Sequence, residues 1–210
     1  GYSQVEGVNY HETFSSTMRN TSTRILLASS IGACPKTGEK IHRRHIDVDK
    51  ASTHADMDCR VIMEQPHGFA TKGKAELLHK ALEGTKQAGH LWQDLTSTKM
   101  RNFGLTQSSV DPCLFYLADG NHWLRIGVFV DDILAVFNSL SLFNKFFKFY
   151  KDTEPKILCH EEGDVERFTG LEVITTKDNS SISIRQKRYI ESMFQKYCSG
   201  VHTVLWTSPV

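Results

Sequence analysis

The sequence predicts an α+β protein with an antiparallel sheet and helices mainly on one face. Strand-like apolar runs are joined by short polar turns, as in 113–130 with its Asp-Gly-Asn turn, and they are interspersed with segments of helical periodicity. The order helix, strand, helix, strand pair, helix and hairpin favours an antiparallel sheet. The 210 residues, 40% of them hydrophobic, suffice for one domain with a substantial core.

Four segments carry apolar residues at helical spacing. Ser15 or Ser16 could cap the first, and the first two are each followed by a glycine that would end them. Leu142, Phe146 and Phe149 predict the apolar side of the third. The predicted helices cover 17–31, 86–104, 140–152 and 187–197.

The predicted strands are rich in β-branched and aromatic residues. In the segment 44–49, Ile46 and Val48 alternate with Asp47, so the Asp47 side chain should lie on the opposite face of the strand. Another short strand is expected to end at Pro66. The predicted strands are 44–49, 60–66, the two halves of 113–130, the run 133–137, and a hairpin of 168–176 and 181–186.

Two adjacent aspartates, Asp131 and Asp132, lie between apolar runs in IGVFVDDILAVF. A polar hairpin turn would explain them, although the Gly or Asn of a tight hairpin is absent. The alternative is a metal site, because adjacent carboxylates repel each other and a divalent cation such as Mg²⁺ or Mn²⁺ removes that repulsion. The residue pattern alone leaves the two alternatives equal. Asp47 on a neighbouring strand would supply the third acidic group that two-metal nucleotidyl transfer requires.

The charge balance excludes nucleic-acid binding through overall charge. The 25 Lys and Arg nearly cancel the 24 Asp and Glu, so any such binding needs a local basic groove. These basic residues either contact phosphates or are ordinary solvated surface residues, and the residue pattern favours the second interpretation. The candidates for phosphate contacts are Arg43, Arg44, Lys72, Lys74, Arg185, Lys187 and Arg188.

The cysteines and the hydropathy indicate the setting in which the protein is found. Five widely spread cysteines predict reduced thiols and an intracellular protein. No apolar run approaches the ~20 residues of a membrane helix, and no secretory signal is seen. The first residues, GYSQ, lack a methionine, so we expect a segment of a longer protein. A zinc site is not favoured, because the sequence has no CxxC or HxxxH pair among the candidate ligands. These candidates are Cys34, His42, His45, His54 and Cys59.

Motifs along nearly the whole chain resemble one family, the reverse transcriptase domain of copia-type LTR retrotransposons. VIMEQPHGF is highly characteristic of that family and SSVDPCLF is typical of it, and the order of the motifs along the chain is that of the family. The matching segments are GYSQVEGVNYHETFS (1–15), RILLA (24–28), IDVDKA (46–51), HADMD (54–58), VIMEQPHGF (61–69), GTKQAGHLW (84–92), SSVDPCLF (108–115), VFVDDILAV (128–136), FTGLEV (168–173) and QKRYIESMFQKY (186–197).

The resemblance implies a polymerase palm with part of the fingers, and an RNA-directed DNA polymerase of a Pol polyprotein. The implied partners are an RNA/DNA primer-template and dNTPs, and the implied setting is a cytoplasmic virus-like particle, while protease, integrase and RNase H regions are missing here. The oligomeric state is unknown. The single domain 1–210 would divide into partial fingers (1–42), palm (43–58), fingers (59–90), palm (91–175) and the start of the thumb or connection (176–210).

The resemblance also implies the residues of the site. Two Mg²⁺ or Mn²⁺ ions would be held by the catalytic aspartates Asp47, Asp131 and Asp132, with the main-chain carbonyl of Val48 assisting. Nucleotide contacts are implied for Val48, Ala51, Ser52, Gly84 and Lys86. For Gly84 and Lys86, a loop glycine and a solvated lysine are nearly equal alternatives.

Several positions depart from the family pattern. Ser52 stands where the family has an aromatic ring that closes the space for a ribose 2′-hydroxyl, and Glu83 replaces a tyrosine near the triphosphate. Gly89 and Ser16 replace prolines, and the basic fingers strand that precedes GYSQ in the family is absent. These departures predict a degenerate nucleotide site. Three hypotheses therefore stay open: a reverse transcriptase, an inactive polymerase-like module that binds nucleic acid, and a non-functional relic of an element.

Overall fold

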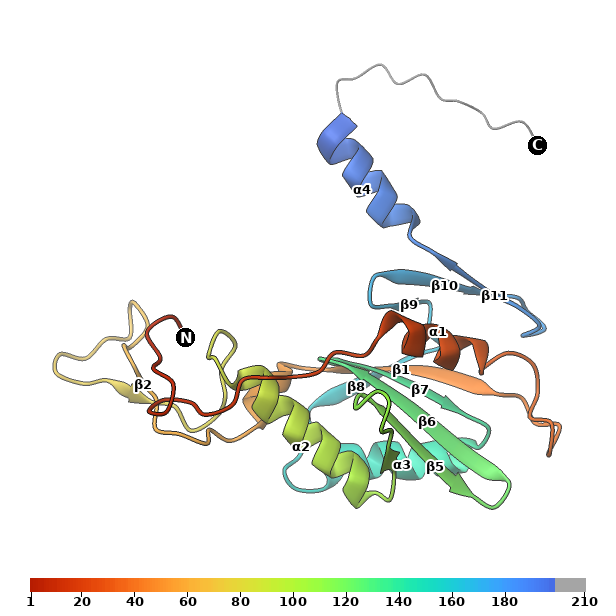
Figure 1. The fold of residues 1–210 in the computed structure, drawn as a ribbon, viewed down its shortest axis with the longest axis horizontal. Coiled ribbons are helices and arrows are strands. Elements are labelled where there is room, and N and C mark those ends of the chain that lie inside the picture. The colour runs from red at the N-terminus through yellow and green to blue at the C-terminus, as the bar shows by residue number, and fades with distance from the viewer. Residues whose placement is uncertain (199–210) are drawn as a thin grey trace.

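The computed structural model describes residues 1–198, and its centre is a six-stranded antiparallel sheet (Figure 1). Each strand pairs antiparallel with its neighbours, which confirms the α+β class with an antiparallel sheet. In spatial order the strands are β4 (Thr106–Gln107), β5 (Leu114–Asp119), β6 (His122–Phe129), β7 (Asp132–Phe137), β1 (His42–Val48) and β8 (Cys159–Gly163).

The helices lie on both faces of this sheet rather than mainly on one. Helices α2 (Ala88–Asn102) and α3 (Leu140–Asp152) cover one face, while α1 (Asn20–Ala28) lies on the other (Figure 1). The reason is β7, in which every residue from Ile133 to Phe137 is buried. A strand that is apolar on both faces needs cover on both. The prediction of one covered face was therefore wrong for α1.

A second, three-stranded sheet shares the face that α1 covers. It consists of β9 (Arg167–Phe168), β10 (Leu171–Thr175) and β11 (Ile182–Arg185), and α4 (Lys187–Cys198) follows it. Its residues Phe168 and Val173 pack in one apolar cluster with Leu27 of α1 and Val136 of β7. The predicted hairpin of 168–176 and 181–186 is thus present, but as part of a separate sheet with an extra strand.

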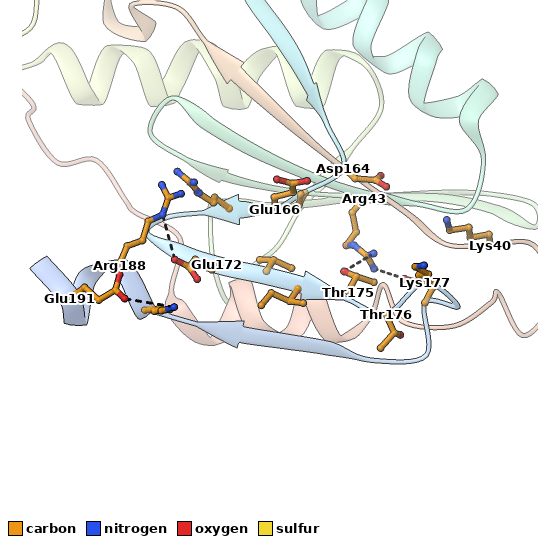
Figure 2. Close-up of a pocket in the computed structure, with 16 residues that line it drawn as sticks. Lys40, Arg43, Asp164, Glu166, Glu172, Thr175, Thr176, Lys177, Arg188 and Glu191 are labelled. Carbon is orange, nitrogen blue, oxygen red and sulfur yellow. Dashed lines mark hydrogen bonds and ion pairs between the residues drawn. The ribbon is translucent and has the colours of Figure 1, made fainter. Parts of the chain in front are cut away.

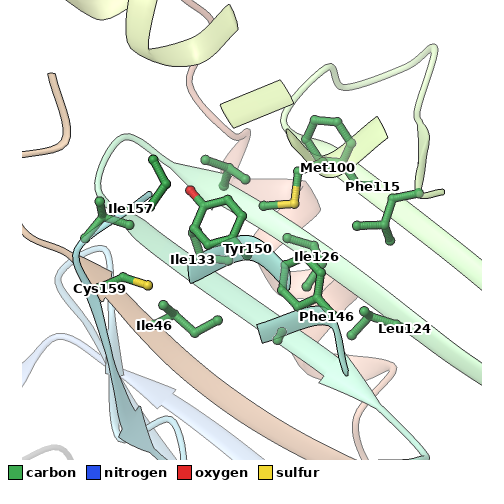
Figure 3. Packing of buried hydrophobic residues seen from close by; sticks show 14 of the residues in the cluster. Ile46, Met100, Phe115, Leu124, Ile126, Ile133, Phe146, Tyr150, Ile157 and Cys159 are labelled. Atoms are coloured by element: carbon green, nitrogen blue, oxygen red, sulfur yellow. The ribbon is translucent and has the colours of Figure 1, made fainter. Parts of the chain in front are cut away.

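The other face of the main sheet holds the larger apolar cluster. Phe146 and Tyr150 of α3 and Met100 of α2 pack against Ile126 and Ile133, and all are fully buried (Figure 3). Burial of an aromatic or aliphatic side chain of this size stabilises by about 1.5–3 kcal/mol. This layer holds β1 and β7, which carry Asp47 and Asp132, and β6, which leads into the turn with Asp131.

The ends of the predicted helices differ from the structure in instructive ways. Helix α1 begins at Asn20, and no side chain caps it, so the predicted cap by Ser15 or Ser16 was wrong. Helix α3 has its predicted bounds, with the Ser139 hydroxyl accepting from the Leu142 N–H. Its buried side consists of Phe143, Phe146 and Tyr150, rather than Leu142, Phe146 and Phe149. A small rotation about the helix axis accounts for that difference.

The segment between β1 and α2 is mostly irregular. A short 3-10 helix, η1 (Ala51–His54), follows β1, and the predicted strand 60–66 is reduced to β2 (Ile62–Met63), paired with β3 (Glu76–Leu77). Only a few apolar residues of this region are buried, so packing gives little support to a longer strand. None of the described helices is long and apolar enough to cross a membrane.

Candidate active site

The three candidate aspartates meet at one end of the main sheet. Asp47, near the end of β1, lies directly opposite Asp132, the first residue of β7. The Val48 N–H donates to the main-chain carbonyl of Asp131 at 3.1 Å. Ile46 and Val48 point into the core, so alternation along β1 places Asp47 on the opposite face, as the sequence predicted.

The carboxylates destabilise one another's charge. The pKa of Asp47 is raised, first by burial and then by the negative charges of Asp132 and Asp131. A bound cation would reverse both causes, because it favours the ionised form of each carboxyl. The chemistry of this donor set, oxygen ligands only, fits Mg²⁺ or Mn²⁺.

As they stand, these side chains do not form a closed metal cage. Within residues 1–198, no three His, Cys, Asp or Glu side chains gather closely enough to hold an ion. One cause is His45, whose Nε2 lies 2.6 Å from Asp132 Oδ1. This hydrogen bond to Asp132 is the main reason that the pKa of His45 is raised. A cation at Asp132 Oδ1 would have to compete with His45.

The sequence reasoning missed the role of His45 and considered it only as a zinc candidate. A signal was available, because His45 lies two residues before Asp47 and therefore on the same face of β1. The other zinc candidates have separate surroundings. Cys34 is buried in the cluster beneath α1, and the His42 ring stacks on Phe137 at 5.5 Å.

The turn that carries the aspartate pair is held by a tryptophan. Val130 has a φ of +56°, a left-handed conformation that is costly for a β-branched residue. The indole Nε1–H of Trp92, in α2, donates to the Val130 carbonyl at 2.7 Å. This contact supplies what the missing turn glycine or asparagine would otherwise provide. The helical spacing predicted Trp92 only as a core residue.

The predicted nucleotide residues fall into two groups. Ala51 and Ser52 lie in η1, directly after β1; Ala51 is buried in the core, and Ser52 is half-buried. Gly84 and Lys86 lie in the exposed loop before α2, and Gly84 has a φ of +90°. The structure therefore brings Ser52 near the turn that carries Asp131, while the main-chain N–H of Lys86 donates to Gln4 of the N-terminal segment.

A buried glutamine, Gln87, fixes the loop that carries Gly84 and Lys86. Its side chain donates to the Asn9 carbonyl at 2.8 Å and to Asp58 Oδ1 at 3.2 Å, and it accepts from Gln4 at 2.9 Å. No periodic pattern indicates this role, because all three partners are distant along the chain.

Three departures from the family pattern line one small pocket. Ser16, Ser52 and Gly89 surround a space of about 50 Å³ that Trp92 and Val130 also line. Each of the three is smaller than the residue that the resemblance implies at its position. A cavity of this size holds a few water molecules. The pocket lies directly under the turn that carries Asp131.

The basic residues do not form one continuous groove. Arg43 is buried, so the expectation of solvated surface was wrong for it. Arg44 pairs with Glu161 and Asp164, Arg188 lies 3.9 Å from Glu172, and Lys187 lies 3.7 Å from Glu191. Of the seven candidates for phosphate contacts, Arg44, Lys187 and Arg188 are thus compensated by nearby acidic side chains.

A groove of about 740 Å³ opens beside the aspartates. His45 and Asp132 form its floor, Phe168 and Gly170 of the β9–β10 turn form one wall, and Tyr189 of α4 lies at its rim. Asp131 is exposed and directly precedes Asp132, which lines this groove. The arrangement can bring an extended ligand along the face of the sheet to the carboxylates.

The family described as "Reverse transcriptase (RNA-dependent DNA polymerase)" matches residues 1–204. The chain is 30% identical, over all of its length, to the retrovirus-related Pol polyprotein from transposon RE2 of Arabidopsis thaliana, of which it covers 14%. It is 29% identical, over 90% of its length, to the Pol polyprotein from transposon RE1 of the same plant, of which it covers 12%. It is 25% identical, over 94% of its length, to the Pol polyprotein from transposon TNT 1-94 of Nicotiana tabacum, of which it covers 14%.

The chain thus spans only about a seventh of the length of these relatives. No solved structure was found to match it. The match to the family covers both strands that carry the aspartates, as well as α2 with Trp92. The chain belongs to the reverse transcriptase family and is such a domain of a copia-type retrotransposon Pol polyprotein.

Proposed function

We propose that this domain carries out RNA-directed DNA synthesis at Asp47, Asp131 and Asp132, with two divalent metal ions. The observation that carries the proposal is that three aspartates lie at one end of an antiparallel sheet, where the pKa of Asp47 is raised first by burial and then by the charges of Asp132 and Asp131. Carboxylates whose charges oppose one another are costly without a cation. Their place on rigid strands suits a site in which distances must be fixed.

The roles follow from position. Asp47 and Asp131 would be the main metal ligands, with the Val48 carbonyl assisting, and Asp132 would join them after leaving His45. Mg²⁺ or Mn²⁺, when bound, activates the attacking 3′-hydroxyl and offsets charge on the triphosphate. Trp92 holds the turn that presents Asp131. Ala51, Ser52, Gly84 and Lys86 would lie near the incoming nucleotide.

The polymerase subdomains are part of the same proposal. Residues 43–58 and 91–175, with the main sheet, would form the palm, and 1–42 and 59–90 would form the fingers. The segment 176–210 would begin the thumb; of it, 199–210 lie outside the described residues. The groove beside His45 and Asp132 would receive an RNA/DNA primer-template.

The test is primer extension on an RNA template with dNTPs and Mg²⁺ or Mn²⁺. Asp131→Asn should abolish extension, because one metal ligand is lost, while folding is retained. Its melting temperature should equal or exceed that of the wild type, since a repulsion is removed. Asp119→Asn is the matched control, because Asp119 is exposed at the end of β5. Full activity of Asp131→Asn would remove the metal assignment.

The alternative is a module that binds nucleic acid without catalysis. The pocket where Ser16, Ser52 and Gly89 meet favours it, because it leaves the nucleotide side of the catalytic turn loosely packed. Tight, salt-dependent binding of a primer-template without any extension would support this alternative. Neither binding nor extension would support the relic.

A further inference from the structure

A second groove, of about 720 Å³, lies on the face of β1 that carries Asp47 (Figure 2). It runs between the segment 164–167 and the β10–β11 hairpin. At one end, the ion pairs of Arg188 with Glu172 and of Lys187 with Glu191 compensate the charges. The other end is different, because three cations gather there: Lys40, Arg43 and Lys177.

Arg43 is a buried cation whose hydrogen-bond partners are all neutral. Only 6% of the residue is exposed. Its Nη1 donates to the Ser30 carbonyl at 3.0 Å, to Ser30 Oγ at 3.1 Å and to Asn179 Oδ1 at 2.9 Å, and its Nη2 donates to Thr175 Oγ1 at 3.1 Å. Its Nε has no partner among the described residues. A buried charge of this kind favours an anion nearby.

The carboxylates that line this groove do not neutralise Arg43 directly. Asp164 is the nearest acidic influence on Arg43, and it is itself bonded to Nη1 of Arg44. Glu166 lies toward the other end of the groove (Figure 2). Asp164 is thus shared between Arg43 and Arg44, while Lys40 and Lys177 add two further positive charges at this end of the groove.

Two lysines lie beside Arg43 at this end of the groove. Lys40 precedes β1 and Lys177 lies in the β10–β11 turn, and both are exposed (Figure 2). In the part of the chain that the structure describes, neither lysine forms an ion pair. Exposed lysines without acidic partners, placed over a buried arginine, suit a phosphate group.

We propose that Lys40 and Lys177, over Arg43, hold a backbone phosphate of the nucleic-acid strand that passes the aspartates. Arg43 and Asp47 share one face of β1 and are four residues apart, a span of about 13 Å. That span equals about four nucleotide steps along a duplex axis. The two grooves share Arg167, Glu172 and Arg188 as lining residues, so they lie next to each other. The inference rests on the proposed function.

The experiment measures affinity for an RNA/DNA primer-template across a salt series. The double variant Lys40→Gln/Lys177→Gln should reduce the slope of log K against log salt by about two, and should weaken binding on the order of tenfold to a hundredfold at 0.1 M salt. The control Lys145→Gln/Lys148→Gln makes the same change in charge at exposed positions of α3, on the opposite face of the sheet. It should leave the slope unchanged.

Each outcome decides between the two proposals. A wild-type chain that binds, with a slope that the Lys40 and Lys177 changes do not alter, overturns this subsite and leaves the proposed function standing. Equal losses in both double variants also overturn it, because the effect is then general electrostatics. A wild-type chain that binds no primer-template overturns both proposals.

A second arm identifies the source of the phosphate. The melting temperature is measured with inorganic phosphate at constant ionic strength, for the wild type and for both double variants. Phosphate should raise the melting temperature of the wild type and of the Lys145/Lys148 control, but not that of the Lys40/Lys177 variant. Together with the reduced salt slope, this result supports a phosphate subsite for nucleic acid. The same rise without any change in salt slope indicates a site for free phosphate and overturns the strand assignment.

Discussion

Ser52 lies in η1 five residues after Asp47, with its side chain on the small pocket beneath Val130. The resemblance implies an aromatic ring at this position, which excludes ribonucleotides by a clash. Serine leaves that space open, and its hydroxyl can hydrogen-bond a 2′-hydroxyl. Loss of a clash of ~3 kcal/mol corresponds to about a hundredfold loss of discrimination.

We therefore expect any polymerase activity of the chain to use rNTPs nearly as well as dNTPs, and Ser52→Phe to restore preference for dNTPs. Single-nucleotide extension with each substrate measures this. Ser52→Ala, which adds no ring, should not restore the preference. A strong preference for dNTPs in the unmodified chain would show that Ser52 does not control the choice of sugar.

Asp111 is a buried carboxylate that holds the start of α1. Its Oδ2 accepts from the Arg19 N–H at 3.1 Å and from the Ser22 hydroxyl at 2.5 Å, and its Oδ1 accepts from the Cys113 N–H at 3.0 Å. Burial by itself would raise the pKa of Asp111, but these hydrogen bonds together hold it below its ordinary value. Asp111 thus does what the predicted serine caps do not.

The lowered pKa makes the contribution of Asp111 depend on pH. Because the folded state has the lower pKa, the contribution is present above the ordinary carboxyl pKa and is lost as pH falls through the folded value. Asp111→Asn should reduce the free energy of unfolding at pH 7 by about 1–3 kcal/mol, and should flatten its decline in acid. Urea unfolding at pH 7 and at lower pH tests this, with Asp119→Asn as control. An unchanged acid profile would contradict it.

The β6–β7 hairpin depends on α2 for its shape. Trp92→Phe removes the indole donor to Val130 but keeps an aromatic ring in the core. We expect a loss of stability of about 1–2 kcal/mol and slower primer extension, because the turn that carries Asp131 is held less firmly. Thermal unfolding and extension rate are measured together. Trp123→Phe on β6 is the control, and an equal loss of extension there would show that the effect is general.

At the scale of the whole molecule, charge is nearly balanced, with a formal net charge of +1. Of the basic side chains that line the two grooves, Lys187 and Arg188 lie near acidic side chains, while Lys40 and Lys177 form no ion pair within the described residues. We expect the primer-template affinity of the wild type to be weak and to depend on few phosphate contacts, fewer than about six by its salt slope. Affinity measured between about 50 and 200 mM salt checks this. A steeper slope would show a larger basic surface than the described residues form.

The sequence by itself determined many of the elements and the faces on which several residues lie, although it did not predict β3, β4, β8 and β9. Apolar periodicity is a local property, so it located α2, α3, β5, β6 and β7 and placed Asp47 away from the core. The aspartate pair also stood out locally, as charge inside an apolar run. Helix α4 was predicted in the same way, although no residue of it is buried.

Only the tertiary structure decided which of these residues meet. The bond of His45 to Asp132, the burial of Arg43 beneath Lys40 and Lys177, and the pocket shared by Ser16, Ser52 and Gly89 join positions far apart in the chain. The face that α1 covers was decided in the same way. The physical reason is that strand register and helix packing depend on the whole core, which no short window of sequence contains.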